Sequence, residues 1–420
     1  MPKTYVTILG KAVRIAARLR GGGSALPGLV VEKIDPNFIK DSLASLPRGV
    51  VVISGTNGKT TTTKMVVELL ESQGLKVFTN RTGSNFTRGV AAALLAEVDI
   101  HGVLTADIAV LELDEAHAVH FVKTIPPRFS LILNVMRDQL DRFGEIDTTT
   151  RMLQEIVSAT TDTVVLNRED PRVSQLTLTN QSSQFFGLAP DLLATFPSDD
   201  DLHTLTKRLN TTVADVTLQA FDGASATFRI GSKDITTRLK LNGIYNVFNA
   251  AAALSLVRTV LGESVNDTKL VTALSQVTPA FGRGETITIN KQPVELVLVK
   301  NPSGFRLSLE SFSPDGYETM IAINDNYADG RDMSWLWDVS FESLRDHSVS
   351  TISGVRAYDM ALRLQYDEVP FLDVIPSLQK ALEHFLHAAP DTPKRIYCTY
   401  TAMLTLRRAL SKLTKVEIVK

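Results

Sequence analysis

The sequence predicts an α/β fold: a first domain with a mostly parallel sheet, then a second, Rossmann-like α/β domain. Two observations predict it. Residues 50–70 pass from an apolar, β-branched run through two glycines into helical spacing. Farther along, short strand-like runs alternate with helical stretches, and several of these runs end in polar clusters. Ligands of open α/β sheets bind at the carboxyl ends of strands, so these clusters are the candidate site.

Composition describes an ordinary globular protein. The 420 residues suffice for two or three domains, with 44% hydrophobic and 21% charged residues. A net charge of −2 gives no overall attraction to nucleic acid. The one cysteine, Cys398, lies in a strand-like run, so we interpret it as a core residue; a disulfide framework or cysteine-cluster metal site is excluded. Neither a signal peptide nor a membrane-spanning run is evident, so we expect a cytoplasmic protein.

Residues 1–45 are predicted to form a basic, helical N-terminal segment. Residues 1–20 are amphipathic, with basic side chains on one helical face and apolar ones on another: Lys11, Arg14 and Arg18 against Leu9, Val13 and Ala16. Such a helix can rest on an anionic membrane surface. The alternative is a helix packed on its own domain with solvated arginines, and the sequence leaves both open.

A phosphate-binding loop follows the strand at residues 50–53. It consists of Gly55, Thr56, Asn57, Gly58, Lys59, Thr60 and Thr61. Backbone N–H groups and the helix N-terminus would face an anion, Lys59 would reach the outer phosphates, and the Thr60 hydroxyl suits Mg²⁺. The spacing is compact, because the common pattern has a glycine where this chain has Ile53.

Carboxylates follow the strand predicted at residues 108–113. Glu112, between apolar neighbours, is expected to be buried beside the phosphate loop, which makes sense if it meets a cation. An acidic helix N-terminus is the alternative, and it suits Asp114 and Glu115 better than Glu112.

Further polar clusters end the next strands. Residues 129–133 lead into the cluster 134–144, and residues 164–167 lead into Glu169 and Asp170. Residues 82–85 form a second candidate ligand-facing loop. These segments would line the same edge of the sheet as the phosphate loop.

A small β-rich insertion is predicted at about residues 180–235, where the composition turns to Ser, Thr and Asp. The parallel pattern is expected to resume at residues 239–249 and to lead into an alanine-rich helix. Asn246 and Asn249 share one face of its start, where they would bond a nucleobase or ribose or simply cap the helix. Arg283 lies at the expected domain boundary, where it could meet a phosphate.

The second α/β unit begins at about residue 286. Residues 294–299 and 320–323 read as buried strands, and the second leads into residues 324–338, which carry four acidic residues and two tryptophans. We expect a functional loop there; the alternative is a capped turn with packed tryptophans.

The compact loop, Glu112, the cluster from Asn134 and the Asn246/Asn249 helix together resemble the central ATPase domain of the Mur ligases over residues 46–285. These enzymes activate a carboxylate as an acyl phosphate and then add an amine. The resemblance implies that Lys59 and its loop bind ATP, and that Thr60 and Glu112 hold Mg²⁺. It further implies nucleotide contacts from Asn246 and Asn249 and a phosphate contact from Arg283.

The sequence also differs from the standard Mur ligases, and these differences indicate which branch of the family it resembles. Only 49 residues precede the strand that leads into the loop, which leaves no room for a UDP-binding domain. Asp138 is followed by Gln139, where those ligases usually have histidine, and no candidate for their carbamylated lysine is evident. With residues 138–145 and the acidic motif, the whole chain resembles the MurT family, including a C-terminal domain at 286–420.

MurT proteins are synthetase subunits of lipid II isoglutaminyl synthase, paired with a GatD glutaminase. The resemblance implies ATP- and glutamine-dependent amidation of the D-glutamate α-carboxyl of lipid II, through an acyl phosphate, at the inner face of the membrane. It also implies that Asp332 completes the Cys–His pair of the partner. Many relatives carry a four-cysteine zinc ribbon near residues 185–235, where this chain has no cysteine, so we expect no zinc.

Two alternatives remain. One is a stand-alone amide ligase of the Mur or folylpolyglutamate type, which would need no second subunit. The other is a nucleotide-driven switch or scaffold, for which the acidic C-terminal motif would have no use.

Overall fold

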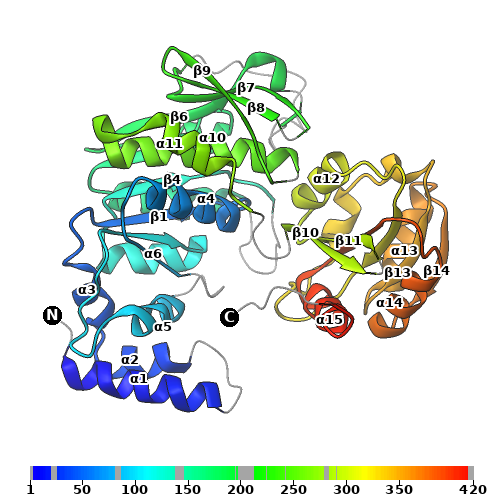
Figure 1. Ribbon diagram of the computed structural model, residues 1–420, viewed down its shortest axis with the longest axis horizontal. Helices are drawn as coiled ribbons and strands as arrows, with labels where there is room; N and C mark the ends of the chain where they lie inside the picture. The colour runs from blue at the N-terminus through cyan, green and yellow to red at the C-terminus, as the bar shows by residue number, and fades with distance from the viewer. Residues whose placement is uncertain are drawn as a thin grey trace.

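The structure, a computed structural model, describes residues 3–19, 26–80, 87–137, 146–193, 195–196, 212–223, 225–241, 243–278, 283–289 and 291–414; for Arg18 and residues 283–285 it describes the backbone alone. These residues form two α/β units, each built on its own sheet (Figure 1). The predicted α/β class with mostly parallel sheets is confirmed. The division into domains at residues 45 and 285 stays a prediction.

The first sheet has the strand order β2-β3-β1-β4-β5-β6-β7-β8-β9, parallel up to β7 and antiparallel beyond it. Its strands are β1 (Val50–Ser54), β2 (Val77–Thr79), β3 (Ile108–Glu112), β4 (Phe129–Ile132), β5 (Thr163–Asn167), β6 (Ser182–Leu188), β7 (Val216–Asp222), β8 (Ser225–Ile230) and β9 (Lys233–Arg238). Ile53 pairs in register with Glu112, and Ser54 pairs with Ile132. The ends of β1, β3 and β4 therefore meet at one edge, where the polar clusters begin.

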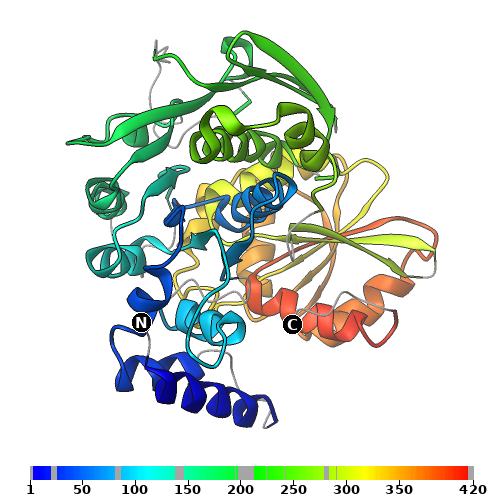
Figure 2. The same cartoon turned by 60° about the vertical axis from the view of Figure 1, so that its left-hand side comes forward.

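Helices cover both faces of this sheet, and the apolar core is split accordingly. One face packs against α4 (Lys59–Ser72), α10 (Ile244–Leu261) and α11 (Asp267–Leu274). The other packs against α5 (Thr87–Glu97), α6 (Glu115–Thr124) and α8 (Ile146–Ala159), while α9 (Pro171–Ser174) follows β5. Helices α1 (Thr4–Leu19), α2 (Leu26–Ile34) and α3 (Phe38–Leu43) belong to this second side, where α1 and α2 form the outermost layer (Figures 1 and 2).

One expectation about the middle of the chain needs correction. The predicted β-rich segment does contain strands, and β6 to β9 extend the main sheet. The prediction that the parallel strands resume at residues 239–249 was wrong. The described residues 239–241 and 243 form no strand, and α10 begins at Ile244. An apolar run cannot by itself distinguish a strand from a buried helix and its lead-in.

Aromatic side chains fix this extension onto α10. The ring of Phe196 lies 5.9 Å from that of Phe221 and 5.5 Å from those of Tyr245 and Phe248. Of the described residues, 244–264 alone are long and apolar enough to cross a membrane, and 72% of that window is buried inside the fold.

The second sheet has the order β10-β11-β15-β12-β13-β14, and all neighbours are parallel except β10 with β11. Its strands are β10 (Arg283–Ile289), β11 (Gln292–Leu298), β12 (Glu318–Ala322), β13 (Val349–Ser353), β14 (Phe371–Ile375) and β15 (Lys394–Cys398). Helices α12 (Pro302–Ser311) and α13 (Ala357–Tyr366) cover one face, and α14 (Leu378–His387) and α15 (Tyr400–Leu410) the other. Cys398 is buried among them, as predicted.

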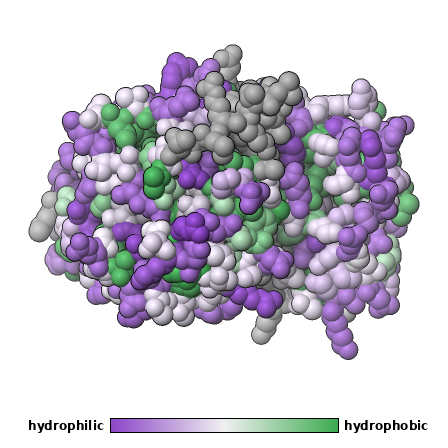
Figure 3. All heavy atoms as spheres, turned by 90° about the horizontal axis from the view of Figure 1, so that it is seen from above, coloured by the Kyte–Doolittle hydropathy of each residue, from purple (hydrophilic) through white to green (hydrophobic). Residues whose placement is uncertain are grey.

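Seen from above, the molecular surface mixes hydrophilic and hydrophobic residues, and the hydrophobic ones form only small groups (Figure 3). This face lies at the opposite end of the molecule from α1.

Candidate functional site

The loop between β1 and α4 needs its two glycines. Gly55 and Gly58 have positive φ values of 128° and 88°, which L side chains rarely adopt. A Cβ at Gly55 would lie 2.9 Å from the backbone N of Asn134, and one at Gly58 would lie 2.6 Å from Oδ1 of Asn249. The glycines therefore permit the bend and let two asparagines approach the backbone.

The end of β4 holds this loop in shape. Thr56 N donates to the Asn134 carbonyl (3.0 Å), and Asn57 N donates to the Asn134 side chain (2.8 Å). Met136 N donates to the Thr56 hydroxyl (3.0 Å). Asn134, which the sequence marks only as the start of a polar cluster, is thus a positioning residue for the loop.

Lys59 is buried at the start of α4. Its amine donates to the carbonyls of Gly55 and Thr56, the latter at 3.3 Å. It also lies 3.4 Å from Oε2 of Glu115. The interpretation of Glu115 as part of a helix N-terminus holds, because α6 begins there, but its ion pair with Lys59 could not be foreseen from spacing.

Glu112 meets Thr60 at the end of β3. The Thr60 hydroxyl donates to Oε1 of Glu112 at 2.8 Å, and the carboxylate is buried. Asn80 fixes the backbone of Glu112 through two hydrogen bonds of 2.8 and 3.0 Å. A carboxylate and a hydroxyl beside a phosphate loop fit Mg²⁺, which binds few protein ligands and takes the rest from phosphates and water. In the described part of the chain, no group of three acidic, His or Cys side chains forms a fuller metal site.

A cleft opens beside the loop, between α10 and the second sheet. Thr61, Asn246 and Asn249 line it from the first unit, as their spacing predicts for the two asparagines. Lys300 and Phe312 lie on the opposite wall. Amide groups opposite an apolar side chain such as Phe312 suit a nucleobase and its ribose.

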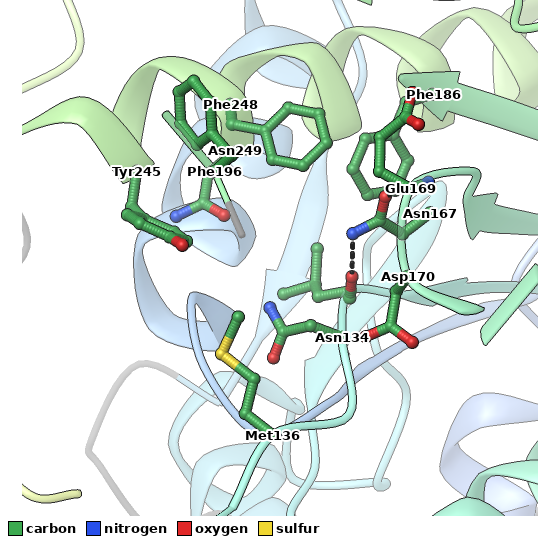
Figure 4. Close-up of a pocket in the computed structure, with 11 residues that line it drawn as sticks. Asn134, Met136, Asn167, Glu169, Asp170, Phe186, Phe196, Tyr245, Phe248 and Asn249 are labelled. Atoms are coloured by element: carbon green, nitrogen blue, oxygen red, sulfur yellow. Dashed lines mark hydrogen bonds between the residues drawn. The ribbon is translucent and has the colours of Figure 1, made fainter. Parts of the chain in front are cut away.

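A second hollow adjoins this cleft through Asn249 (Figure 4). Its polar end is formed by side chains at or just after the ends of β4 and β5: Asn134, Asn167, Glu169 and Asp170. Asn167 donates to the Leu133 carbonyl (2.8 Å), and Asp170 accepts from Val135 N (2.7 Å). The two clusters predicted from sequence thus meet at one edge of the sheet.

Direct contacts link the second unit to the loop. The Asn301 amide donates to Oδ1 of Asn57 at 3.1 Å, and the Lys300 amine donates to the Thr56 carbonyl at 3.4 Å. Asn301 also caps α12 through Gly304 N (2.7 Å). The Asn-Pro sequence could have predicted the cap, but nothing in the sequence places it against the phosphate loop.

The acidic motif follows β12, and its carboxylates have different environments. Asp325 pairs with Arg356 at 2.8 Å. Asp329 is 3% exposed and accepts from Thr401 N (2.7 Å); burial raises its pKa above the ordinary value. Asp332 is partly exposed, and its Oδ1 accepts from Ser334 N (2.9 Å). The motif is therefore an anchored loop that keeps Asp329 buried and presents Asp332 and Asp338 near the surface.

The two tryptophans of the motif also differ. Trp335 is buried with its ring 6.4 Å from that of Phe305, as the packed-turn alternative expects. Trp337 is 49% exposed, and its ring lies 5.6 Å from that of Tyr366 on α13. The loop is thus partly core and partly surface.

Several predicted positions lie outside the described residues: the candidate loop 82–85, Asp138, Gln139 and the side chain of Arg283. Their roles stay predictions.

Known families match most of the chain. The model of the Mur ligase middle domain matches residues 53–257, and that of the MurT ligase C-terminal domain matches residues 298–403. The subunit MurT of lipid II isoglutaminyl synthase (glutamine-hydrolyzing) from Streptococcus pneumoniae is 32% identical over 97% of this chain and 97% of its own. The chain belongs to the MurT family. The MurT subunit from Staphylococcus aureus strain COL is 29% identical over 86% of this chain and 87% of its own.

Solved structures show the same fold outside the MurT family. MurF ligase from Thermotoga maritima, in complex with ADP, matches with a TM-score of 0.68 at 18% identity, over 90% of this chain and 83% of its own. Folylpolyglutamate synthase from Mycobacterium tuberculosis, complexed with ADP and AMPPCP, matches with a TM-score of 0.63 at 16% identity, over 92% and 94%. This MurT-family chain therefore has the Mur ligase fold.

Proposed function

We propose that this MurT-family protein is the synthetase subunit that amidates the α-carboxyl of D-glutamate in lipid II, with ATP as the energy source. One observation carries the proposal: a buried Lys59 and a Thr60–Glu112 pair belong to the loop and helix start that line one wall of a cleft, and Lys300 lies on the opposite wall. Carboxylate activation by ATP needs such a cation-lined phosphate site.

In the proposed reaction, a carboxylate oxygen of the substrate attacks the γ-phosphorus of ATP, and ADP leaves. Ammonia then attacks the carbonyl carbon of the acyl phosphate; phosphate leaves with the bonding electrons, the nitrogen loses a proton, and the amide forms. Lys59 and Lys300 would bind the phosphates, with Asn246 and Asn249 holding the nucleoside. Thr60 and Glu112 would hold Mg²⁺, which supplies charge neutralisation when bound.

The proposed nitrogen donor is glutamine, hydrolysed by a GatD-type subunit whose Cys–His pair Asp332 completes. A carboxylate near the surface, such as Asp332, can reach a residue of another protein, and orienting a catalytic histidine is a known task of carboxylates. The outward side of α13 supports this assignment, since Tyr358, Leu362 and Tyr366 recur at helical spacing and are exposed. We place the complex in the cytoplasm, at the inner face of the membrane where its lipid substrate is found.

Reconstitution tests the proposal. The chain, a GatD-type partner, lipid II, ATP and glutamine should yield amidated lipid II in mass spectra, with one ADP released for each amide. Ligation of a free amino acid without a second subunit would favour the alternative of a stand-alone amide ligase. ATP hydrolysis that ignores every carboxylate substrate would contradict both.

A further inference from the structure

Helix α1 turns basic side chains inward. The Lys11 amine donates to the carbonyls of Val98 (2.7 Å) and Leu95 (3.2 Å), and Arg14 donates to that of Leu95 (3.4 Å). These carbonyls lie at the C-terminal end of α5, where cations satisfy the open acceptors and favour the helix dipole. Lys11 and Arg14 are therefore structural residues and not a solvated basic face.

Two glycines allow α1, α2 and α5 to pack closely against one another. A Cβ at Gly10 of α1 would lie 2.6 Å from Val31 of α2, and a Cβ at Gly28 of α2 would lie 2.0 Å from the Arg88 carbonyl of α5. The three helices consequently pack closely, and the outward side of α1 is determined by the fold.

That outward side is apolar. We define the α1 face as the exposed side chains at the i, i+3, i+4 spacing of one helical stripe: Tyr5, Ile8, Leu9, Ala12, Ile15, Ala16 and Leu19. Ile15 is 61% exposed and Leu19 is 84% exposed. Exposed Leu26 and Ile34 of α2 and exposed Ile100 beyond α5 belong to the same helical layer. The layer lies at an extremity of the molecule in both ribbon views (Figures 1 and 2).

The segment that carries this face is basic on balance, even without the inward-turned Lys11 and Arg14. The first 48 residues contain eight basic side chains (Lys3, Lys11, Arg14, Arg18, Arg20, Lys33, Lys40 and Arg48) and three acidic ones (Glu32, Asp35 and Asp41), in a chain whose net charge is −2. Helix α1 itself has no acidic residue. An apolar stripe within a basic segment is complementary to an anionic bilayer, which offers both hydrocarbon and negative headgroups.

We propose that the α1 face is a membrane-docking surface, whose side chains enter the boundary between headgroups and acyl chains of an anionic bilayer. The inference deepens the proposed function, because it rests on a lipid-linked substrate. Helix α1, 16 residues and about 24 Å long, would lie parallel to the membrane. Its apolar side chains would supply the binding, and the basic residues of the segment other than Lys11 and Arg14 would favour anionic lipid.

Vesicle binding of the full chain tests this inference. Sedimentation with vesicles of equal parts phosphatidylglycerol and phosphatidylethanolamine should show binding that weakens when phosphatidylcholine replaces phosphatidylglycerol. The double variant Ile8→Glu/Ile15→Glu should lower the partition coefficient at least about tenfold, since charges enter the bilayer boundary at high cost. Val213→Glu is the matched control, because Val213 is 87% exposed and far along the chain; it should bind as the parent does.

Three results would overturn the inference: absence of vesicle binding by the parent chain, unchanged binding by the double variant, or a parent dimer that the double variant converts to monomer. The last would assign the face to a second copy. If the double variant unfolds, Leu19→Ser provides the same test with a smaller expected loss. Amidation of detergent-solubilised lipid II should survive in the double variant, whereas failure of the proposed function would abolish that reaction in the parent and leave vesicle binding intact.

Discussion

The loop after β1 and the loop after β12 hold their functional groups in opposite ways. Both follow a buried parallel strand at the carboxyl edge of its sheet. The first loop leads into the buried Lys59, and a hydrogen bond to the Asn134 side chain holds it in place. The second buries Asp329 as an anchor and leaves Asp332 partly exposed.

This difference indicates what each loop acts on. A lysine that is buried at the base of a loop beside a cleft can bind only a ligand small enough to enter that cleft. A carboxylate on a surface loop, beside the half-exposed Trp337, can take part in a site completed by another protein. We therefore propose that the first loop activates the carboxylate and that the second takes part in glutamine use, and the following variants test that division.

The largest effect is expected for Lys59→Ala. Loss of the buried cation should lower the rate of amidation at least about a hundredfold, because charge that develops on the phosphates would lose its stabilisation. Lys64→Ala is the matched control on the same helix, where Lys64 pairs with Glu68 at 3.8 Å. Initial rates of ADP release measure both; full activity in Lys59→Ala would remove the loop from the reaction.

Asp329→Asn should affect stability and its pH dependence. An amide in place of the carboxyl would turn an NH₂ group toward donors from Thr401 or Asn326, which costs about 1–3 kcal/mol in the free energy of unfolding. Burial raises the pKa of Asp329, so its contribution is complete below the ordinary pKa of 3.8 and is lost as pH rises through the raised value. Urea unfolding at several pH values should show the advantage of the parent shrinking in that window; a growing advantage would contradict it.

Asn301 both caps α12 and contacts the loop after β1, and Asn301→Ala, compared with a plain cap variant, distinguishes these two roles. Asn301 caps α12 and Asn266 caps α11 (Lys269 N, 3.0 Å), so replacing either by Ala should cost about 1 kcal/mol of stability. Only Asn301→Ala also removes the hydrogen bond to Asn57, which should raise KM for ATP about threefold to tenfold. Equal KM values in the two variants would show that Asn301 acts only as a cap.

The smallest effect is expected for the exposed ion pair between the two units. Arg137 and Asp338 lie 3.0 Å apart, and the pair Arg128–Asp162, within the first unit, is equally exposed at 3.1 Å. Asp338→Asn should change KM for ATP by less than about threefold, and the change should disappear at high salt. Asp162→Asn, measured over the same salt series, should leave KM unchanged.

The part of the site that follows local sequence rules was predictable. Glycines at positive φ, a lysine at the start of a helix and asparagines three residues apart in a helix start depend on neighbours in sequence, and the structure places Lys59, Asn246 and Asn249 accordingly. Strand alternation also predicted the mostly parallel sheets.

Contacts between distant segments could not be predicted. Lys300 and Asn301 reach the phosphate loop across 244 residues of chain, and no local pattern encodes that approach. The orientation of α1 shows the same limit: the sequence indicated an amphipathic helix, but Gly10 and the carbonyls of α5 determine that Lys11 points inward.

The division of labour between the two loops is tested most directly by changing the nitrogen source. In the complex with a GatD-type partner, lipid II amidation should be measured with glutamine and with ammonium for the parent, Lys59→Ala and Asp332→Asn. We predict that Lys59→Ala loses both reactions, whereas Asp332→Asn loses the glutamine reaction, keeps the ammonium reaction and still binds the partner. An unchanged glutamine-driven rate in Asp332→Asn, or equal loss with both nitrogen sources, would contradict the assignment.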